Sequence, residues 1–475
     1  MKIAYTILFL LTVEITSAQT NDFDIEAISQ LGLKTVSIYT ADGEEPTCDF
    51  VEAPEGCMGM TCINATKVPC RVIINDADNI LYDSGDYKKS ESGATIRING
   101  NTSAYFAVGE NRPYKIKLQK KADLLDRHDD RYADKDWRLI KDAITLNTII
   151  GLRISQLLDF SWTPCYTPCN LFINDDYKGC YLLIESVERN ADCRINVDKK
   201  TGYIVERDPY WWAETQYFDT DFFASSKAYR WTWKYPDEDD VTEEQTDYIR
   251  QYINQAEQSV SNGNYQQFID VESFAKWVLA HDILGTRDSG GSNLYLAKQD
   301  NTDNSLLKIP CIWDFDSNFQ MMPGDFSKIH EHTSDFYYHQ LFNSSNKAFV
   351  RAYKNIWNRL QPTLLADITK YIKAYTESDE GKALNASRQY HFKRWDYGID
   401  MVRIEDDAEE ALEWFNSHLY LINEKINALD DTEAAIQHTS ADKHHNNEIY
   451  CLTGIKTKTD NKGIYIKNRK KYVVR

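Results

Sequence analysis

In the first half of the chain, hydrophobic and polar residues alternate in short runs that are separated by turn residues. The runs at 34–40 and 70–76 have the two-residue period of a strand with one buried face. Residues 94–98 and 113–118 alternate in the same way on either side of a loop that contains Gly, Asn and Ser, so we predict a β-hairpin there. Further strands are expected at 169–175, 179–187 and 201–208, and one helix over 136–158.

The second half of the chain instead has the 3.6-residue period of amphipathic helices. Thr242 is followed three residues later by Gln245, the capping-box pattern of a helix start, and Asp270 is a suitable N-cap for the next helix. These patterns predict an α+β protein with an N-terminal, mostly antiparallel β lobe and a C-terminal, mostly helical lobe. The expected helices cover residues 241–260, 270–284, 347–375 and 405–429.

The two ends of the chain differ from the rest. Residues 1–18 contain a Lys, an apolar run and small residues, the pattern of a signal peptide that is cleaved after Ala18, so we expect a secreted or cell-surface protein. No later run of 18 apolar residues occurs, and no transmembrane segment is predicted. A polar linker is expected at 431–447, and the segment 448–475 is basic, unlike the acidic remainder of the chain.

Composition narrows the choice of partners. The formal net charge is −19, so the surface repels nucleic-acid phosphates and we expect no nucleic-acid partner. All ten cysteines follow residue 18 and can be oxidised in an exported protein. Disulfides are favoured over a zinc site, because the spacings lack a C-x2-C pair and no His is nearby. The clearest cluster consists of Cys48, Cys57, Cys62 and Cys70.

A stretch that follows residue 285 contains the residue types that phosphoryl transfer requires. This reaction needs a carboxylate that orients the acceptor hydroxyl and oxygen ligands for a metal ion on the nucleotide. Asp288 and Asn293 are five residues apart in a loop with two Gly, and Asp314 follows an apolar strand. Such hard oxygen ligands suit Mg²⁺ or Mn²⁺. Because helix caps and turns use the same residue types, this spacing by itself leaves a purely structural role open.

Basic residues lie upstream on the predicted hairpin. Lys115 and Lys117 share one face of a strand, where a Lys is more often solvated than bound to a ligand. Arg97 precedes a Gly-Asn-Thr-Ser loop whose backbone N–H groups could bind phosphate. The chain has no G-x-G-x-x-G motif, so the glycine-rich lid of standard protein kinases is absent.

Six segments occur in one order along the chain: RINGNTS, NRPYKIKL, DDYKGCYLLIESVE, WKYPDEDDVTEEQTDYI, DVESFAKWVLAHDIL and IPCIWDFDSNF. Together they resemble the CotH kinase family, which is named for the spore-coat protein CotH, over roughly residues 90–325. The resemblance implies an atypical protein-kinase-like fold, ATP with Mg²⁺ or Mn²⁺ as cofactors, and Ser or Thr of a protein substrate as the acceptor.

The resemblance also implies roles for single residues. Asp288 matches the catalytic carboxylate, and Asn293 and Asp314 match the metal ligands. Lys117 matches a strand Lys that holds the nucleotide phosphates, with Glu185 in the place of its ionic partner. With Arg97, which precedes the Gly-Asn-Thr-Ser loop, the residues expected to bind the cofactor are Arg97, Lys117 and Glu185.

Two other functions remain open at this stage. One is a non-catalytic surface protein that uses a kinase-like cleft for binding. The other is a glycoside hydrolase with Trp211 and Trp212 in a sugar cleft, although we expect both side chains in the core. The acceptor protein and the oligomeric state are not determined by the sequence.

The expected domain organisation follows from these patterns. The tail resembles the C-terminal sorting domain of secreted Bacteroidetes proteins, with Cys451 where Asp is usual, and a final β-hairpin of the main domain is the alternative. The expected parts are a signal peptide (1–18), a β-rich region (19–90), a CotH kinase-like domain (91–430, with a β-rich lobe to about 210 and a helical lobe from about 211), a linker (431–447) and a sorting-like segment (448–475).

Overall fold

The computed structural model divides the chain into two compact units, residues 1–431 and 432–475. The first unit is described over residues 23–222, 227–286, 292–319 and 336–431, and the second over Thr432 and four strands. The expected signal peptide and most of the expected linker lie outside these residues. Among the described residues, no helix has both the length and the apolar character needed to cross a membrane.

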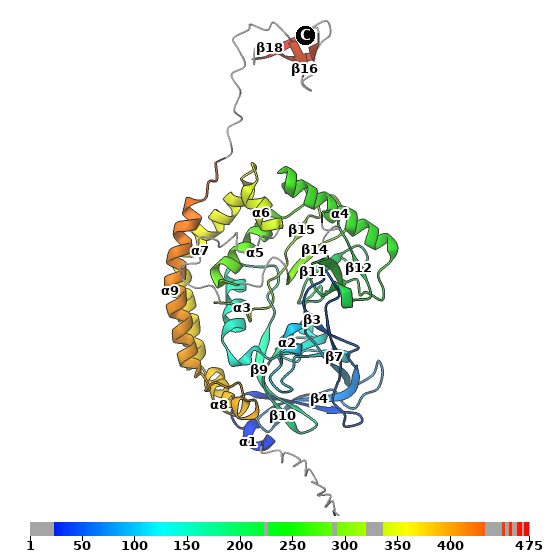
Figure 1. Cartoon of the computed structure of the whole chain (residues 1–475), viewed down its shortest axis with the longest axis vertical. Coiled ribbons are helices and arrows are strands. Elements are labelled where there is room, and N and C mark those ends of the chain that lie inside the picture. Colours follow the sequence, from blue (N-terminus) through cyan, green and yellow to red (C-terminus); the bar gives the residue numbers. More distant parts are fainter. Residues whose placement is uncertain are drawn as a thin grey trace, which may run out of the picture. The chain divides into compact units, whose positions relative to one another are not determined.

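An eight-stranded sheet forms the lower part of the first unit in Figure 1. Its order is β1-β9-β10-β8-β7-β6-β4-β5, and the neighbours are antiparallel except for the parallel pair β1 and β9. Because β1 also pairs with β4, the sheet closes on itself around apolar side chains such as Ile116 and Trp137. The strands are β1 (Lys34–Thr40), β4 (Val68–Asp76), β5 (Asn79–Asp83), β6 (Ala94–Ile98), β7 (Tyr114–Ala122), β8 (Asp134–Ile140), β9 (Tyr166–Ile173) and β10 (Asp176–Glu185).

Several sequence predictions for this sheet are confirmed. The expected hairpin is formed by β6 and β7, and the expected strand pair 169–175 and 179–187 corresponds to β9 and β10. The helix expected over 136–158 is wrong in its first part, because residues 134–140 form β8 and the helix starts only at Asn147. In β8, buried Trp137 and Leu139 alternate with more exposed residues, which is the period of a strand.

A second, five-stranded sheet has the order β12-β13-β11-β14-β15. Most of its strands fall within the region that we expected to be the helical lobe, so the boundary near residue 210 is not a boundary between β and α structure. The apolar runs in this region are short and pair over long distances in sequence, which local periodicity does not reveal. The strands are β11 (Tyr203–Asp208), β12 (Tyr217–Phe218), β13 (Arg230–Tyr235), β14 (Leu294–Lys298) and β15 (Leu307–Lys308).

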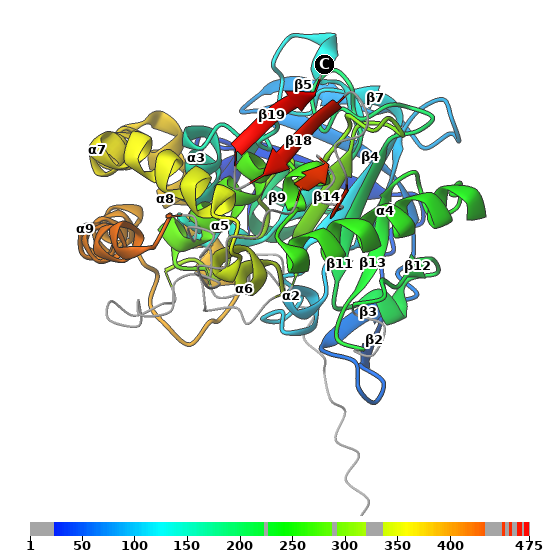
Figure 2. The ribbon, with the colours of Figure 1, turned by 90° about the horizontal axis from the view of Figure 1, so that it is seen from above.

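Helices make up most of the C-terminal part of the first unit, so the predicted α+β class with a β-rich N-terminal region is confirmed. Thr242 and Gln245 form the expected capping box, and the Asp270 side chain accepts from Ser273 N. In both views α7, α8 and α9 gather on the side opposite to α4 (Figures 1 and 2). The helices are α3 (Asn147–Leu157), α4 (Glu243–Asn262), α5 (Val271–Leu284), α6 (Phe336–Asn343), α7 (Ala348–Glu377), α8 (Asp379–Arg394) and α9 (Ile404–Ala428).

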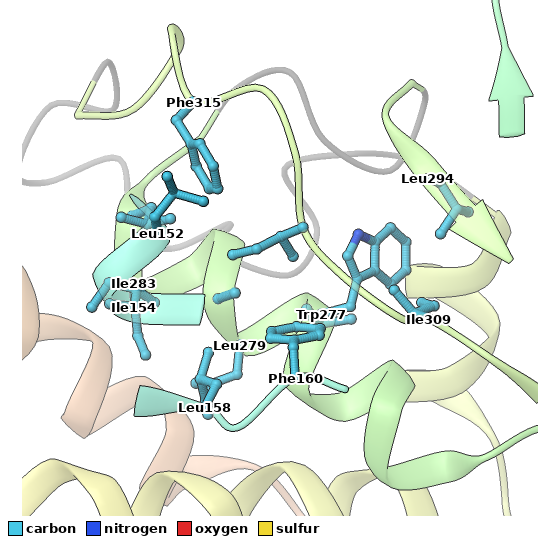
Figure 3. Close-up of a cluster of buried hydrophobic side chains, with 14 of the residues drawn as sticks. Leu152, Ile154, Leu158, Phe160, Trp277, Leu279, Ile283, Leu294, Ile309 and Phe315 are labelled. Carbon is cyan, nitrogen blue, oxygen red and sulfur yellow. The ribbon is translucent and has the colours of Figure 1, made fainter. Parts of the chain in front are cut away.

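The main apolar core joins the helices to both sheets. Figure 3 shows side chains of α3 beside those of α5, with Phe315 packed against this cluster. Phe315 lies directly on Gly151 of α3, where an added Cβ would clash with its ring. This contact anchors the segment that carries Asp314 to a buried helix.

Shorter elements complete the first unit. The strands β2 (Asp49–Glu52) and β3 (Met60–Ile63) form a separate hairpin, and the short helices are α1 (Ile25–Ser29) and α2 (Thr102–Tyr105). The nine cysteines from Cys48 to Cys311 are thiols in the structure, so disulfide formation stays a prediction. The second unit contains an antiparallel sheet of order β17-β16-β18-β19, with β16 (Ile449–Cys451), β17 (Lys456–Thr457), β18 (Gly463–Lys467) and β19 (Lys470–Val474).

Candidate functional site

A cleft of about 1200 Å³ opens between the two sheets of the first unit. Its lining comes from the outer face of the eight-stranded sheet, from one face of the five-stranded sheet, from the β2–β3 hairpin and from residues 292–316. A cavity of this size is large enough for a nucleotide-sized ligand. The expected residues Arg97, Asn293 and Asp314 all line it.

The wall formed by the eight-stranded sheet is basic. Arg97 on β6 lies opposite Lys115 on β7, which lies opposite Arg138 on β8, and Ile184 on β10 continues the row. Residues that pair directly across antiparallel strands point to the same face. The row therefore points outward from the closed sheet, and Arg97, Arg138 and Ile184 reach the cleft.

The wall formed by the five-stranded sheet carries acidic side chains and Lys234. Glu206 on β11 lies opposite Tyr295 on β14 and opposite Thr232 on β13, two residues before Lys234. The Lys234 Nζ atom is 2.7 Å from the Glu206 Oε2 atom. Asp208 is buried beside this pair and accepts hydrogen bonds from Tyr210 N at 2.7 Å and Thr232 Oγ1 at 3.2 Å.

Burial and mutual charge change the protonation of this second wall. Burial raises the pKa of Asp208 to about 7, and nearby Glu206 adds to the effect. Desolvation by the surrounding protein atoms also raises the pKa of Glu214, although this side chain keeps contact with solvent. For Lys234, burial alone would lower the pKa, but Glu206, Glu214 and Asp208 outweigh it and hold the pKa above its ordinary value. The wall thus combines a stable ion pair with a carboxyl group that titrates near neutral pH.

Asn293 and Asp314 meet at one end of the cleft. The Asn293 Nδ2 atom is 3.3 Å from the Asp314 Oδ2 atom, although the two residues are 21 positions apart in the chain. Both have a left-handed backbone, with φ of 57° and 66°. This conformation is uncommon for residues other than Gly, although Asn and Asp tolerate it best, and it recurs at functional sites. The two residues that the resemblance matches to metal ligands thus lie together in the structure, and metal binding by them stays a prediction.

The donor atoms at this end fit a divalent cation that is bound together with a nucleotide. Asn293, Asp314 and Asp316 offer amide and carboxylate oxygens to the cleft, and Mg²⁺ prefers such hard ligands. Over the described part of the chain, no three His, Cys, Asp or Glu side chains are close enough to form a metal cage by themselves. Mg²⁺ commonly uses one or two carboxylates and completes its shell with phosphate oxygens and water.

Two of the expected cofactor-binding residues lie elsewhere. Lys117 is on the outer face of β7 but is exposed and outside the lining of the cleft. Glu185 lies opposite buried Trp137, so its side chain points to the inner face of the same sheet. The two side chains thus lie on opposite faces, and the expected Lys117–Glu185 pair is wrong. Glu185 pairs with Arg127 instead, with 2.9 Å between Nη1 and Oε1.

Asp288, the expected catalytic carboxylate, belongs to residues 287–291 and lies outside the described residues. The expectation that Trp211 and Trp212 are core residues is wrong, because both are only partly buried. Trp212 lines the cleft and donates from Nε1 to the Met58 carbonyl oxygen at 3.3 Å. This contact links the β2–β3 hairpin to the five-stranded sheet.

Sequence reasoning did not identify Arg138, Glu206 or Lys234 as cleft residues. Arg138 was hidden because residues 136–158 were read as helix, although the alternation of buried and polar residues around Trp137 was a usable signal. Glu206 and Lys234 lie on strands that are far apart in the chain and become neighbours only through the pairing of β11 with β13. Nothing in the local sequence of either strand indicates that pairing.

The site is a polar cleft between two sheets, with cations on one wall, carboxylates on the other and a paired Asn and Asp at one end. The family model described as CotH kinase protein matches residues 96–417, which is more than half of the chain. The chain therefore belongs to the CotH kinase family. A search of curated proteins finds no match.

Proposed function

We propose that the protein is a metal-dependent kinase that transfers the γ-phosphoryl group of ATP to Ser or Thr of protein substrates, and that it acts outside the cytoplasm. The observation that carries this proposal is the Asn293–Asp314 pair in a cleft of about 1200 Å³, within the region that matches the kinase family. Asp288 lies five residues before Asn293, as the spacing of a phosphoryl-transfer loop requires.

Each residue has a distinct task in this proposal. Asp288 orients the acceptor hydroxyl and accepts its proton late in the transfer. Asn293 and Asp314 hold Mg²⁺ or Mn²⁺, which would neutralise charge on the phosphates when it is bound. Arg97 attracts the phosphate groups from the basic wall. The exposed position of Lys117 favours Arg97 over Lys117 for this task.

The decisive experiment measures transfer of label from γ-labelled ATP to casein or to the protein itself, with Mg²⁺ or Mn²⁺ and with a chelator. We expect incorporation into Ser or Thr that the chelator abolishes and that Asp314→Asn reduces strongly. Asp130→Asn is the matched control, because Asp130 is exposed on the surface.

The result also separates the alternatives. ATP binding without transfer in the wild-type protein would contradict the kinase and leave a non-catalytic nucleotide-binding protein. Absence of both binding and transfer would contradict the nucleotide site itself. Mass spectrometry of the phosphorylated residues identifies the acceptor type in the remaining case.

A further inference from the structure

The basic wall of the cleft contains two arginines on either side of a lysine whose charge is already balanced. The Lys115 Nζ atom is 3.0 Å from both Asp136 Oδ1 and Glu188 Oε1. Among the described residues, neither Arg97 nor Arg138 forms an ion pair. Both guanidinium groups line the cleft, and no described carboxylate lies within ion-pair distance of either one.

Arg138 is held in position on two sides. The Asn99 side-chain amide is assigned so that its oxygen faces the neighbouring donors. In this orientation Asn99 Oδ1 accepts from Arg138 Nη1 at 2.8 Å and from Gly100 N at 3.1 Å. On the other side, the Arg138 guanidinium lies 5.7 Å from the centre of the Trp313 ring. Asn99 belongs to the loop after β6, and Trp313 directly precedes Asp314. The guanidinium is thus fixed next to the segment that carries the candidate metal ligand.

Arg138 also keeps donors for a ligand. A guanidinium has five N–H groups, and the contact with Asn99 uses one of them. Its Nε–H is buried and has no hydrogen-bond partner among the described residues. A buried donor without a partner is unfavourable, so an anion that draws this side chain toward the cleft can supply the missing acceptor.

The wall formed by the five-stranded sheet offers no unpaired Lys that would attract an anionic ligand in the described residues. Lys234 on this wall is paired with Glu206, and Glu214 lies close enough to raise the Lys234 pKa further. An anionic ligand is repelled by these carboxylates and attracted to the arginines across the cleft. The charge distribution therefore orients a nucleotide with its phosphates toward the eight-stranded sheet.

We propose that Arg138, with Arg97 on the far side of Lys115 in the same row, binds the phosphate groups of the nucleotide beside the segment that carries Asp314. This assignment rests on the proposed function, since it concerns the same cleft. Arginine suits the task because its planar fork can donate two parallel hydrogen bonds to one phosphate. Arg138 and Arg97 together take the role of holding the phosphates that the sequence suggested for Lys117.

The test compares binding of Mg²⁺-ATP and of adenosine by calorimetry in the wild type, Arg138→Gln and Arg131→Gln. Arg131 is the matched control, since its side chain is 70% exposed and paired with Asp129. We expect Arg138→Gln to weaken ATP binding about 10-fold or more while adenosine affinity is unchanged, because only ATP carries the phosphates that the guanidinium contacts. Arg131→Gln should match the wild type for both ligands.

The outcomes separate this assignment from the function on which it rests. Equal ATP affinity in Arg138→Gln and the wild type, with loss of metal-dependent binding in Asp314→Asn, overturns the role of Arg138 and leaves the kinase proposal intact. A wild type that does not bind ATP overturns both. A parallel loss of ATP and adenosine affinity in Arg138→Gln also overturns the phosphate contact, since it indicates a distorted cleft.

A second variant covers the case in which Arg138→Gln does not fold, which its thermal unfolding curve shows. Arg138→Lys keeps the charge but removes the fork and the contact geometry to Asn99. We expect it to lower ATP affinity at least about 3-fold and to leave adenosine affinity unchanged. Wild-type ATP affinity in folded Arg138→Lys, across a range of salt concentrations, overturns the assignment of a bidentate contact.

Discussion

Glu185 and Arg127 form an ion pair on the inner side of the eight-stranded sheet, on the face opposite to Lys117. The Glu185 side chain is 1% exposed and also accepts from Cys165 N at 3.0 Å. Both carboxylate oxygens are therefore engaged in contacts within the protein. This arrangement indicates a structural role for Glu185 rather than the nucleotide-binding role that the sequence suggested.

A structural role makes a direct prediction for Glu185→Ala. The substitution leaves Arg127 with part of its charge unbalanced and leaves the Cys165 N–H without an acceptor, so the free energy of unfolding should fall by about 3 kcal/mol. Nucleotide affinity of the folded variant should change little, because the side chain points away from the cleft. Urea denaturation and calorimetry measure the two quantities.

Glu91→Ala is the control for this change, since Glu91 is exposed and paired with Lys88 on the surface. Its effect should stay within about 0.5 kcal/mol. A folded Glu185→Ala protein of wild-type stability with strongly reduced ATP affinity would return Glu185 to the nucleotide site.

The Asn293–Asp314 contact gives a second prediction. Asp314→Asn keeps the size of the side chain but removes the negative charge that a divalent cation requires. We expect metal-dependent ATP binding to weaken about 10-fold or more, while binding measured with a chelator stays as in the wild type. Titration of ATP with and without Mg²⁺ compares the two conditions.

The exposed Asp130→Asn variant controls for the loss of one negative charge anywhere on the surface. If Asp314→Asn retains the full gain in ATP affinity on adding Mg²⁺, Asp314 is not a metal ligand.

The sequence was sufficient where the structure depends on local signals. The capping box at Thr242 and the N-cap at Asp270 are fixed by side chains within one turn of the helix start, and both are present. The β6–β7 hairpin follows from alternation on both sides of a loop with turn residues. The family resemblance matched Asn293 and Asp314 to metal ligands, and their contact in the structure is a long-range one that spacing alone does not indicate.

Long-range pairing explains what the sequence did not reveal. In the sequence, Lys117 and Glu185 are oppositely charged residues on two strands and could form a pair. In the structure, the register of β8 against β7 and β10 places the two side chains on opposite faces of the sheet. A shift of one residue would reverse that result, and no local pattern determines the register. The Glu206–Lys234 pair depends in the same way on which strand lies beside β11.

Export provides a third prediction. The mature protein should begin near Gln19, and cysteines of the 48–70 cluster should be oxidised after secretion. Burial raises the pKa of the Cys62 and Cys70 thiols to about 12, so reduced thiols at these positions react slowly in the folded protein. Alkylation must therefore be done under denaturing, non-reducing conditions before mass spectrometry. Four alkylated cysteines in the cluster would contradict oxidation.

Asp208 predicts how stability depends on pH. Because burial raises the folded-state pKa to about 7, above the value of about 3.9 for an unfolded chain, the folded protein binds this proton more tightly. The stabilisation is present below pH 4 and is lost as pH rises toward 7. Asp208→Asn has no carboxyl group at this position and does not lose stability in this way. The melting temperature of the variant minus that of the wild type should therefore be larger at pH 8 than at pH 5, by about 3 °C or more.

The charged groups that face Asp208 are Glu206, Lys234 and Glu214. These groups are present in the wild type and in Asp208→Asn alike, so they do not by themselves produce the expected difference between the two proteins. Asp130→Asn again serves as the control and should show a constant difference from the wild type. Melting curves of Asp208→Asn and wild type that stay parallel over this pH range would mean that Asp208 is ionised throughout.

The last prediction concerns Asp288 and separates catalysis from binding. Asp288→Asn keeps size and most hydrogen bonding but removes the charge that orients the acceptor hydroxyl and accepts its proton. ATP should therefore bind with nearly wild-type affinity, while turnover falls by roughly 10²-fold or more. Arg138→Gln should show the opposite balance, with a clear loss of ATP affinity, because a phosphate contact acts before and during transfer. Equal turnover in wild type and Asp288→Asn, with ATP bound by both, would contradict the kinase mechanism and favour a non-catalytic nucleotide-binding protein.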